Sequence, residues 1–376
     1  MKKIAVIIII LIYLPGIIFS QTKVGTTQGE FLLISPSIRS NGMGQVGAAL
    51  VDEYSFYYNP GSLGLYYLKD EFSITPWSGT NDMGGKFTYD HQSFSIPLLL
   101  KQYSKGKSIG ISGVLSSNKY RNPKMEETDY NRVPTGRTIR FENFDYNISL
   151  GFGYSGLVEI GTGFSVKKFG EKVNINDYST SYLAYDFGGI IRIPLGKYFQ
   201  LSSSEKYNLI LLPSIGFSYS NIDSKIKLDG DSYPFPKTYR TGFAVTCGVN
   251  RSASFGHWEI GTLVPAIEIE KTKGIKHISK YGVELGIVEA FYLRLGSKEV
   301  ENISVSTWGF TINSGGIFKT ILALKSTDPD KLNKTINFLA NRLTFQYSMA
   351  NYNHDSSYDN DPFRGFSIKY KLSRLN

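Results

Sequence analysis

The feature of this sequence that most constrains its fold is a strict alternation of apolar and polar residues over ten or more positions. In residues 143–154, for example, every second residue is aromatic or aliphatic, and the intervening ones are small or polar. A period of two places the two sets on opposite faces of a β-sheet. Strands in soluble proteins are mostly about 5–6 residues long, whereas strands that span a bilayer need about 9–11. The pattern therefore predicts strands long enough to cross a membrane.

Fourteen such stretches can be counted along the chain. They lie near residues 70–77, 86–96, 107–118, 138–154, 156–169, 181–194, 207–220, 237–250, 255–270, 276–287, 289–297, 303–312, 341–351 and 365–374. If the chain enters from the periplasm, the long connections face outward and several tight turns face inward, which is typical of outer-membrane barrels. The long connections are 119–137, 170–180, 221–236 and 352–364.

One inward connection, 313–340, is also long. It contains Asp328-Pro329 followed by apolar residues at helical spacing. This segment is either a short amphipathic helix or a sign that the count is wrong by one hairpin.

Composition excludes several other classes of protein. A chain with 41% hydrophobic, 14% aromatic and 19% charged residues is not a disordered one, which would be poor in aromatic residues and rich in charge. Cys247 is the single cysteine, so a disulfide scaffold and a cysteine-based zinc cluster are excluded. We predict an all-β fold, a transmembrane antiparallel β-barrel of about fourteen strands. A secreted β-sandwich or propeller is the alternative, but the strands are too long for it and no propeller-like repeat is visible.

The N-terminal residues 1–20 have the layout of a secretory signal peptide. Lys2 and Lys3 precede an apolar run, Pro15-Gly16 interrupts this run near its end, and Ser20 offers a small residue before Gln21. A permanent helical anchor is the alternative. Without these two lysines, 39 basic residues face 32 acidic ones (41 − 2 = 39), a net charge of +7. Because this charge is scattered and the chain is exported to the Gram-negative outer membrane, we expect no nucleic-acid partner.

Residues 21–69 differ from the barrel region, 70–376, because the alternation is absent. Glycines are frequent in this segment, and Asn59-Pro60-Gly61 is a turn signal. A segment too irregular to span a membrane has room in the lumen of a fourteen-strand barrel. We therefore predict that residues 21–69 form a hatch inside the barrel. In that setting a buried Arg39 needs a carboxylate, and Asp52 is the local candidate.

At these residues the chain resembles a known family. Residues 31–65 are similar to the N-terminal hatch of PorV/PorQ-type outer-membrane proteins, which belong to a wider superfamily of FadL-like barrels, and Ile34-Ser35-Pro36 favours the PorV side. The matching positions are Phe31, Arg39, Gly42, Met43, Gly44, Asp52, Asn59, Pro60 and Leu63.

The resemblance implies two different roles, neither of them enzymatic and neither requiring a cofactor. PorV-like proteins serve the type IX secretion system: they bind cargo from the translocon by its C-terminal signal domain and deliver it to a surface attachment complex. FadL-like proteins instead pass small hydrophobic molecules across the outer membrane. The first role is favoured here, transport is the alternative, and a purely structural member of a surface complex is a third possibility. The hatch residues would then have a structural or gating role.

The outer loops contain the second group of candidate residues. A peptide or folded partner could dock on their basic and aromatic side chains, among which Tyr233 to Pro236 look like an exposed cluster; alternatively, the loops are solvated and face lipid and lipopolysaccharide. The candidates are Arg121, Lys124, Arg132, Arg137, Tyr233 and Phe235. The four histidines show no metal-ligand spacing, so we expect no metal site.

Overall fold

The computed structural model describes most of the chain. The predicted signal peptide and Lys124 lie outside the described residues. The described ranges are 30–82, 86–103, 106–122, 125–130, 132–174, 178–196, 207–222, 225–228, 231–253, 256–273, 277–300, 303–324, 332–353 and 363–372.

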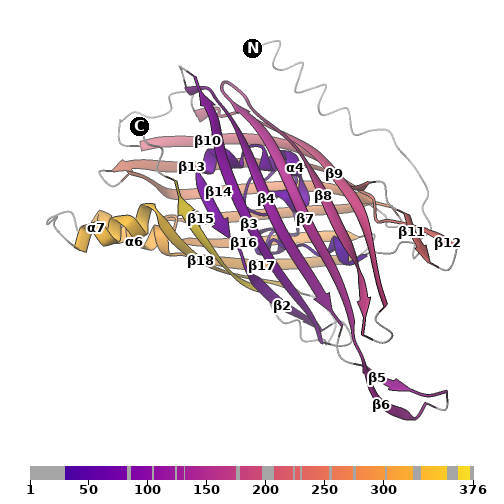
Figure 1. Cartoon of the computed structure of the whole chain (residues 1–376). Coiled ribbons are helices and arrows are strands. Elements are labelled where there is room, and N and C mark those ends of the chain that lie inside the picture. Colours follow the sequence, from indigo (N-terminus) through magenta and orange to yellow (C-terminus); the bar gives the residue numbers. More distant parts are fainter. Residues whose placement is uncertain are drawn as a thin grey trace.

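The main sheet is antiparallel and closes on itself as a barrel (Figure 1). It has 15 strands, of which β1 and β2 share one position, so that fourteen positions surround the lumen. The barrel strands are β1 (Glu71–Ile74), β2 (Trp77–Asp82), β3 (Lys86–Gln102), β4 (Ser108–Arg121), β7 (Phe141–Ser155), β8 (Glu159–Val173), β9 (Tyr178–Arg192), β10 (Tyr207–Ile222), β13 (Thr238–Ala253), β14 (Gly256–Thr272), β15 (Ile278–Ile287), β16 (Phe291–Val300), β17 (Ile303–Asn313), β18 (Leu343–Asn353) and β19 (Phe363–Lys371). The predicted fold, a barrel of about fourteen strands, is confirmed.

The first strand position is interrupted where it meets the last strand. Pro76 separates β1 from β2, yet both pieces pair with β19 and β3 in one continuous register. The Phe366 N–H donates to the Pro76 carbonyl at 3.3 Å, but proline has no N–H with which to return the bond. The seam that closes the barrel is therefore weakened at Pro76.

The two ends of the barrel differ. At one end two hairpins extend the connections: β5 (Met125–Thr128) pairs with β6 (Pro134–Ile139), and β11 (Lys225–Leu228) pairs with β12 (Asp231–Pro234). The other end has short turns and the helices α6 (Ser314–Leu324) and α7 (Leu332–Asn341) (Figure 1). The helix predicted after Asp328-Pro329 is α7, and the strand count is correct. Among the described residues, no helix is long and apolar enough to cross a membrane.

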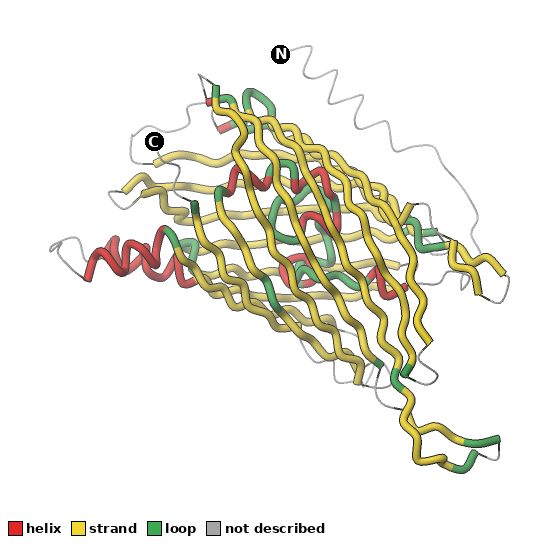
Figure 2. The backbone as a smooth tube through the Cα atoms, viewed as in Figure 1, coloured by secondary structure: helices red, strands yellow, loops and turns green. Residues whose placement is uncertain are grey.

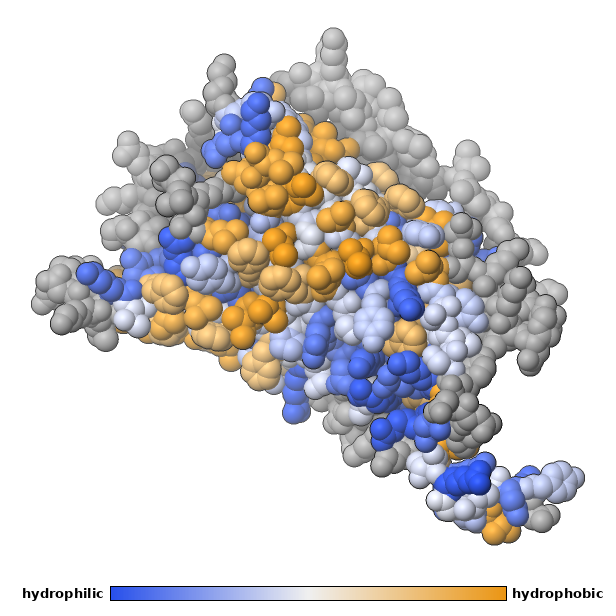
Figure 3. All heavy atoms as spheres, viewed as in Figure 1, coloured by the Kyte–Doolittle hydropathy of each residue, from blue (hydrophilic) through white to orange (hydrophobic). Residues whose placement is uncertain are grey.

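The outer wall carries an apolar belt, visible as an orange band in Figure 3. Along the strands, exposed apolar residues alternate with buried small or polar ones, as the period of two requires. A soluble protein rarely exposes so large an apolar surface, whereas a lipid-facing barrel requires it. Members of the belt include Ile96, Leu98, Leu115, Ile148, Phe152, Phe187, Phe217, Ile267, Leu293, Leu295 and Phe366.

The N-terminal segment lies inside the barrel (Figure 2). It consists of short helical turns joined by loops, and almost all of its side chains from Ser35 to Tyr67 are buried. The turns are η2 (Glu30–Leu33), α2 (Ile38–Asn41), α3 (Ser55–Tyr58), α4 (Pro60–Leu63) and η3 (Tyr66–Lys69). We call residues 30–70 the hatch.

Glycines allow the hatch backbone to lie directly on the barrel wall. A Cβ atom at Gly61 would collide with the backbone of Gly188 and Gly189 on β9, and one at Gly44 would collide with β15 and β16. Gly44 also has a φ of +66°, which favours glycine. Because backbone touches backbone at these points, the hatch has little freedom to shift as a rigid body.

Candidate functional site

The predicted partner of Arg39 is present, but it is the weaker of two. Arg39 Nη1 lies 3.2 Å from Asp52 Oδ2, which confirms the predicted pair. Arg39 also donates from Nε and Nη2 to the two carboxylate oxygens of Glu284 on β15, at 3.0 and 2.7 Å. Arg294 Nε donates to the same carboxylate at 2.6 Å. Glu284 therefore joins the hatch to the wall through a bidentate contact, which is the stronger geometry.

Asp52 has a second role inside the hatch. Its Oδ1 accepts from the Tyr54 N–H at 2.9 Å, so it holds the turn that begins α3. Burial raises the pKa of the Asp52 carboxyl above its ordinary value, although Arg39 acts in the opposite direction. Asp52 thus divides its two oxygens between Arg39 and the Tyr54 N–H, whereas both oxygens of Glu284 accept from Arg39. Glu284 is therefore the principal counter-ion of Arg39.

A second charged anchor holds the middle of the hatch. One carboxylate oxygen of Glu268, on β14, accepts from the backbone N–H groups of Gly47 and Ala48 at 2.8 and 2.7 Å. Lys280 Nζ lies 2.9 Å from the other oxygen of Glu268 and 2.6 Å from Glu270. The buried carboxylate is thus both paired and hydrogen-bonded, as a buried charge requires.

Asn59 and Pro60 form a third anchor. The Asn59 amide donates to the carbonyls of Ala48, at 2.7 Å, and of Gly189 on the wall, at 3.0 Å. Its Oδ1 accepts from the Gly61 N–H at 2.9 Å, which caps α4, and Pro60 occupies the first helical position. The Asn59-Pro60-Gly61 turn signal in the sequence therefore corresponds to a contact between hatch and wall.

The Gly42-Met43-Gly44 run packs against the opposite wall. Gly42 faces Gly309 on β17, and Met43 is fully buried in a cluster with barrel alanines and Val264. All the hatch candidates thus have a structural contact. The arrangement offers no nucleophile with a base, and no group of three metal-ligating side chains occurs among the described residues.

Aromatic side chains gather at the long-loop end of the hatch. They belong to one buried cluster of hatch and wall residues, which includes Tyr57, Tyr58, Trp77, Tyr89 and Phe363. Above the cluster is a pocket of about 10 Å³, room for about one water molecule, lined by hatch residues Phe31, Leu32 and Ile34 and by wall residues that include Tyr89. We call it the mouth pocket.

A larger hollow lies on the outside of the wall, next to Pro76. This wall groove has a volume of about 990 Å³ and is lined by residues of β2, β3, β4, β7 and β19, among them Trp77 and His91. The side chains of Trp77 and His91 are buried, 5% and 1% exposed; Trp77 belongs to the aromatic cluster, and the His91 ring contacts Phe56 and Trp77. The ring of Trp77 lies 4.9 Å from that of Tyr89, centroid to centroid. The Trp77–Tyr89 pair therefore lies between the mouth pocket and the wall groove.

The sequence did not reveal Trp77, Tyr89 and Glu284 as site residues. Trp77 stood at the end of a predicted strand, and nothing local distinguishes it from belt aromatics. An inward-facing tryptophan beside a proline in a strand is the signal that would have singled it out.

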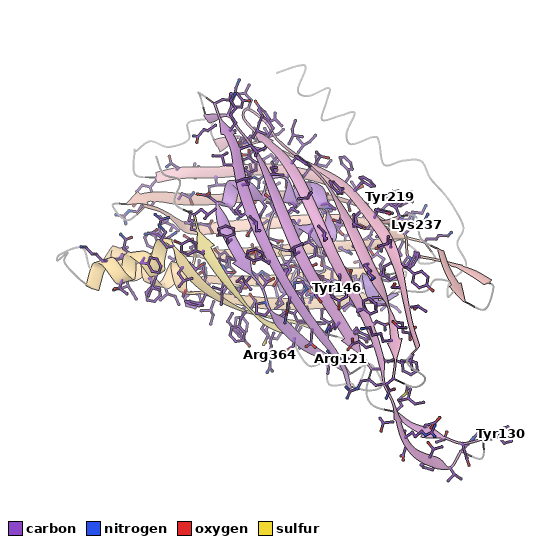
Figure 4. All side chains as sticks on the ribbon, in the orientation of Figure 1. Arg121, Tyr130, Tyr146, Tyr219, Lys237 and Arg364 are labelled. Carbon is purple, nitrogen blue, oxygen red and sulfur yellow. The ribbon has the colours of Figure 1, made fainter. Side chains whose placement is uncertain are left out.

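The outer-loop candidates are not brought together. Arg121 is the last residue of β4 and lies on the outer wall, paired with Asp90 and Glu142 at 2.5 and 2.7 Å. Arg132 and Arg137 are exposed on the β5–β6 hairpin, where Tyr130 is fully exposed at the tip (Figure 4). Tyr233 belongs to β12, where its backbone pairs with Ile226.

The expectation of an exposed cluster around Phe235 is wrong. Phe235 is fully buried and packs edge-on against Phe169 at 4.7 Å between centroids, in a cluster with Leu32 of the hatch and Ala184. Burial of a large aromatic surface outweighs the loop-like composition around it. Phe235 is therefore part of the core rather than a docking residue.

No family model and no curated protein matches the sequence. Solved structures with a similar fold include the toluene transporter TbuX of Ralstonia pickettii (9% identity, TM-score 0.47, covering 91% of this chain and 100% of that one). They also include the toluene transporter TodX of Pseudomonas putida (8%, 0.42, 94% and 100%) and the transport unit of the Escherichia coli autotransporter AIDA-I (10%, 0.39, 81% and 89%). At these values the fold assignment rests on the strand pairing itself.

Proposed function

We propose that this chain is an outer-membrane barrel through which small hydrophobic molecules pass. A molecule would enter the mouth pocket from the long-loop end, which faces the outside, and leave through the wall at the Pro76 seam into the membrane. The α6–α7 end would then face the periplasm, which agrees with the usual asymmetry of outer-membrane barrels.

The observation that carries this proposal is the Trp77–Tyr89 contact. Tyr89 lines the mouth pocket, Trp77 lines the wall groove, and the two rings are in van der Waals contact. Rotation of these rings would join a 10 Å³ pocket to a groove of about 990 Å³, which is within the volume range of small-molecule sites. The rings of Tyr89 and Trp77 and, in the groove, of Phe366 give an apolar molecule a surface to follow along this path.

The proposal is tested by the entry of N-phenyl-1-naphthylamine, a fluorescent hydrophobic probe, into Gram-negative cells that produce the protein. We expect faster entry than in cells without it, and still faster entry with Trp77→Ala. Trp308→Ala is the matched control, because Trp308 lies half-buried on β17, away from this path. Equal entry with and without the protein would refute transport. Equal entry with both alanine variants, each folded, would refute the path through Trp77.

Cargo binding in type IX secretion, implied by the resemblance in residues 31–65, is the second candidate. It is favoured by the β5–β6 hairpin, which projects from the barrel and exposes Tyr130, Val133 and Met125 (Figure 1). Its partners would be the translocon, the C-terminal domains of cargo and the attachment-complex proteins. Affinity purification from mild-detergent outer membranes tests it: secreted proteins that share a C-terminal domain would support it, and a barrel with lipids alone would contradict it.

A further inference from the structure

The outer wall changes from apolar to polar within one step along several neighbouring strands. Toward the long-loop end, Phe94 on β3 is followed on the same face by Gln92 and Asp90, and Phe366 on β19 is followed by Arg364. On β4, Leu115 is followed by Ser117, Lys119 and Arg121. With the long-loop end facing outward, as proposed above, this change corresponds to the level at which the hydrocarbon of the outer leaflet ends and its headgroups begin.

Two cations at this boundary, Arg364 on β19 and Lys119 on β4, lie in one row of residues that are paired across neighbouring strands. Arg364 pairs in register with Ser78, Ser78 with Asp90, and Asp90 with Lys119. The two cations are therefore three strand spacings apart, roughly 14 Å. Figure 4 shows Arg364 and Arg121 near the same end of the wall.

Some cations in this region have carboxylate partners and others do not. Arg121 is held between Asp90 and Glu142, so these two carboxylates are already engaged. Within the described part of the chain, neither Lys119 nor Arg364 forms an ion pair with a carboxylate. On β8, which is separated from β4 by β7, Lys168 and Lys172 are also exposed on the outer face. Among the described outer-face residues of these strands at this boundary, five cations against two carboxylates give a net charge of +3 (5 − 2 = 3).

The boundary also coincides with the wall groove. The outside of a barrel is convex, so a hollow of about 990 Å³ there is unusual. Its lining combines the cations Lys119, Arg121 and Arg364 with the apolar surfaces of Tyr146 and Phe366. A ligand that fits this lining carries separated negative charges and continues into apolar chains.

We propose that this groove binds the phosphorylated headgroup of a lipopolysaccharide molecule in the outer leaflet. One phosphate would lie at Lys119 and the other at Arg364, while Phe366 and the belt below, including Phe94 and Leu115, would contact the acyl chains. A glycerophospholipid with one phosphate satisfies only one of the two cations. Two cations roughly 14 Å apart therefore favour a headgroup with two phosphates over one with a single phosphate.

The inference does not depend on transport, and its test has a separate readout. Binding of three probes to the full-length barrel in detergent is measured by native mass spectrometry: bis-phosphorylated lipid A, monophosphorylated lipid A and phosphatidylglycerol. The variant is Lys119→Gln/Arg364→Gln. The matched control is Lys101→Gln/Lys107→Gln, which removes two exposed cations at the short-turn end of β3 and β4.

We expect bis-phosphorylated lipid A to bind most tightly to the native protein and to the control. A juxtamembrane cation contributes about fivefold to the binding of an anionic lipid, so the variant should bind about 25-fold more weakly. Equal binding of phosphatidylglycerol and bis-phosphorylated lipid A would overturn the inference, as would equal affinities of the variant and the control. A native-like shift in electrophoretic mobility on heating confirms that each variant is folded.

Discussion

Replacing Glu284 by glutamine tests whether buried charge holds the hatch to the wall. Arg39, Arg294, Glu284 and Asp52 form a group of two cations and two anions, which is neutral. Glu284→Gln leaves this group with a charge of +1 at a side chain that is 5% exposed. Removing one partner of a buried ion pair costs about 3–5 kcal/mol. Because Asp52 still pairs with Arg39 and Thr311 Oγ1 still accepts from Arg294 at 2.6 Å, we expect the lower end, about 3 kcal/mol.

The outer wall offers a matched control with the same three groups. Arg121 lies between Asp90 and Glu142, as Arg39 lies between Asp52 and Glu284. The Glu142 side chain is 23% exposed, and water screens the pair. We therefore expect Glu142→Gln to lower the free energy of unfolding by less than about 1 kcal/mol.

The assay is reversible urea unfolding of the barrel in phospholipid vesicles, followed by tryptophan fluorescence. Protease digestion of the folded variants reports in parallel whether the hatch has become accessible. If Glu284→Gln and Glu142→Gln lower the free energy of unfolding equally, burial does not determine the strength of these contacts. That result would refute the role of the buried Glu284 as the stronger anchor.

Two further predictions concern the backbone contacts of the hatch. Gly61→Ala places a methyl group against the β9 backbone. It should lower the free energy of unfolding by about 1–3 kcal/mol and make the hatch accessible to protease. Gly113→Ala is the control: its Cβ would lie 3.6 Å from the nearest side chain, and it should change neither the free energy of unfolding nor the protease digestion. Asn59→Ala removes a buried amide that donates to two carbonyls and caps α4, and should lower the free energy of unfolding by about 2 kcal/mol. The exposed Asn174, which also makes two 2.7 Å hydrogen bonds, is its control, and Asn174→Ala should lower the free energy of unfolding by about 0.5 kcal/mol or less. Comparable losses from Asn59→Ala and Asn174→Ala would contradict this role for Asn59.

The barrel could be predicted because its signal is local. A period of two over ten or more residues fixes strand, face and length without knowledge of any distant residue. The Arg39–Asp52 pair was predictable for the same reason, since the two residues are 13 positions apart. Glu284 is 245 positions from Arg39, and only the register of β15 in the closed sheet brings it to the hatch. A single sequence contains no signal for that register.

For Phe235, a local signal was present in the sequence but was misleading. Its neighbours Pro234 and Pro236 have the composition of an exposed loop, and this composition was the only local evidence. Its burial depends on Phe169 and Leu32, which come from β8 and the hatch. The glycines of the wall were visible in the sequence as part of the inward face of the strands. Their role is to leave the wall without side chains where the hatch backbone packs on it, as Gly189 does for Gly61, and this contact is visible only in the folded structure.

The distribution of contacts around the hatch indicates which movement is the least costly. Expelling the whole hatch would break the Arg39–Glu284 pair and the Glu268 contacts with Gly47 and Ala48, and each buried pair broken costs about 3–5 kcal/mol. Rotation of Trp77 separates its ring from those of Tyr89, His91 and Phe363, and each such pair contributes about 0.5–1.5 kcal/mol beyond the burial of its surface. The same seam already lacks one backbone hydrogen bond at Pro76. If small apolar molecules pass through this barrel as proposed, a path opens at lower cost by rotation of Trp77 in the wall than by removal of the hatch, and no gross displacement of residues 30–70 is required.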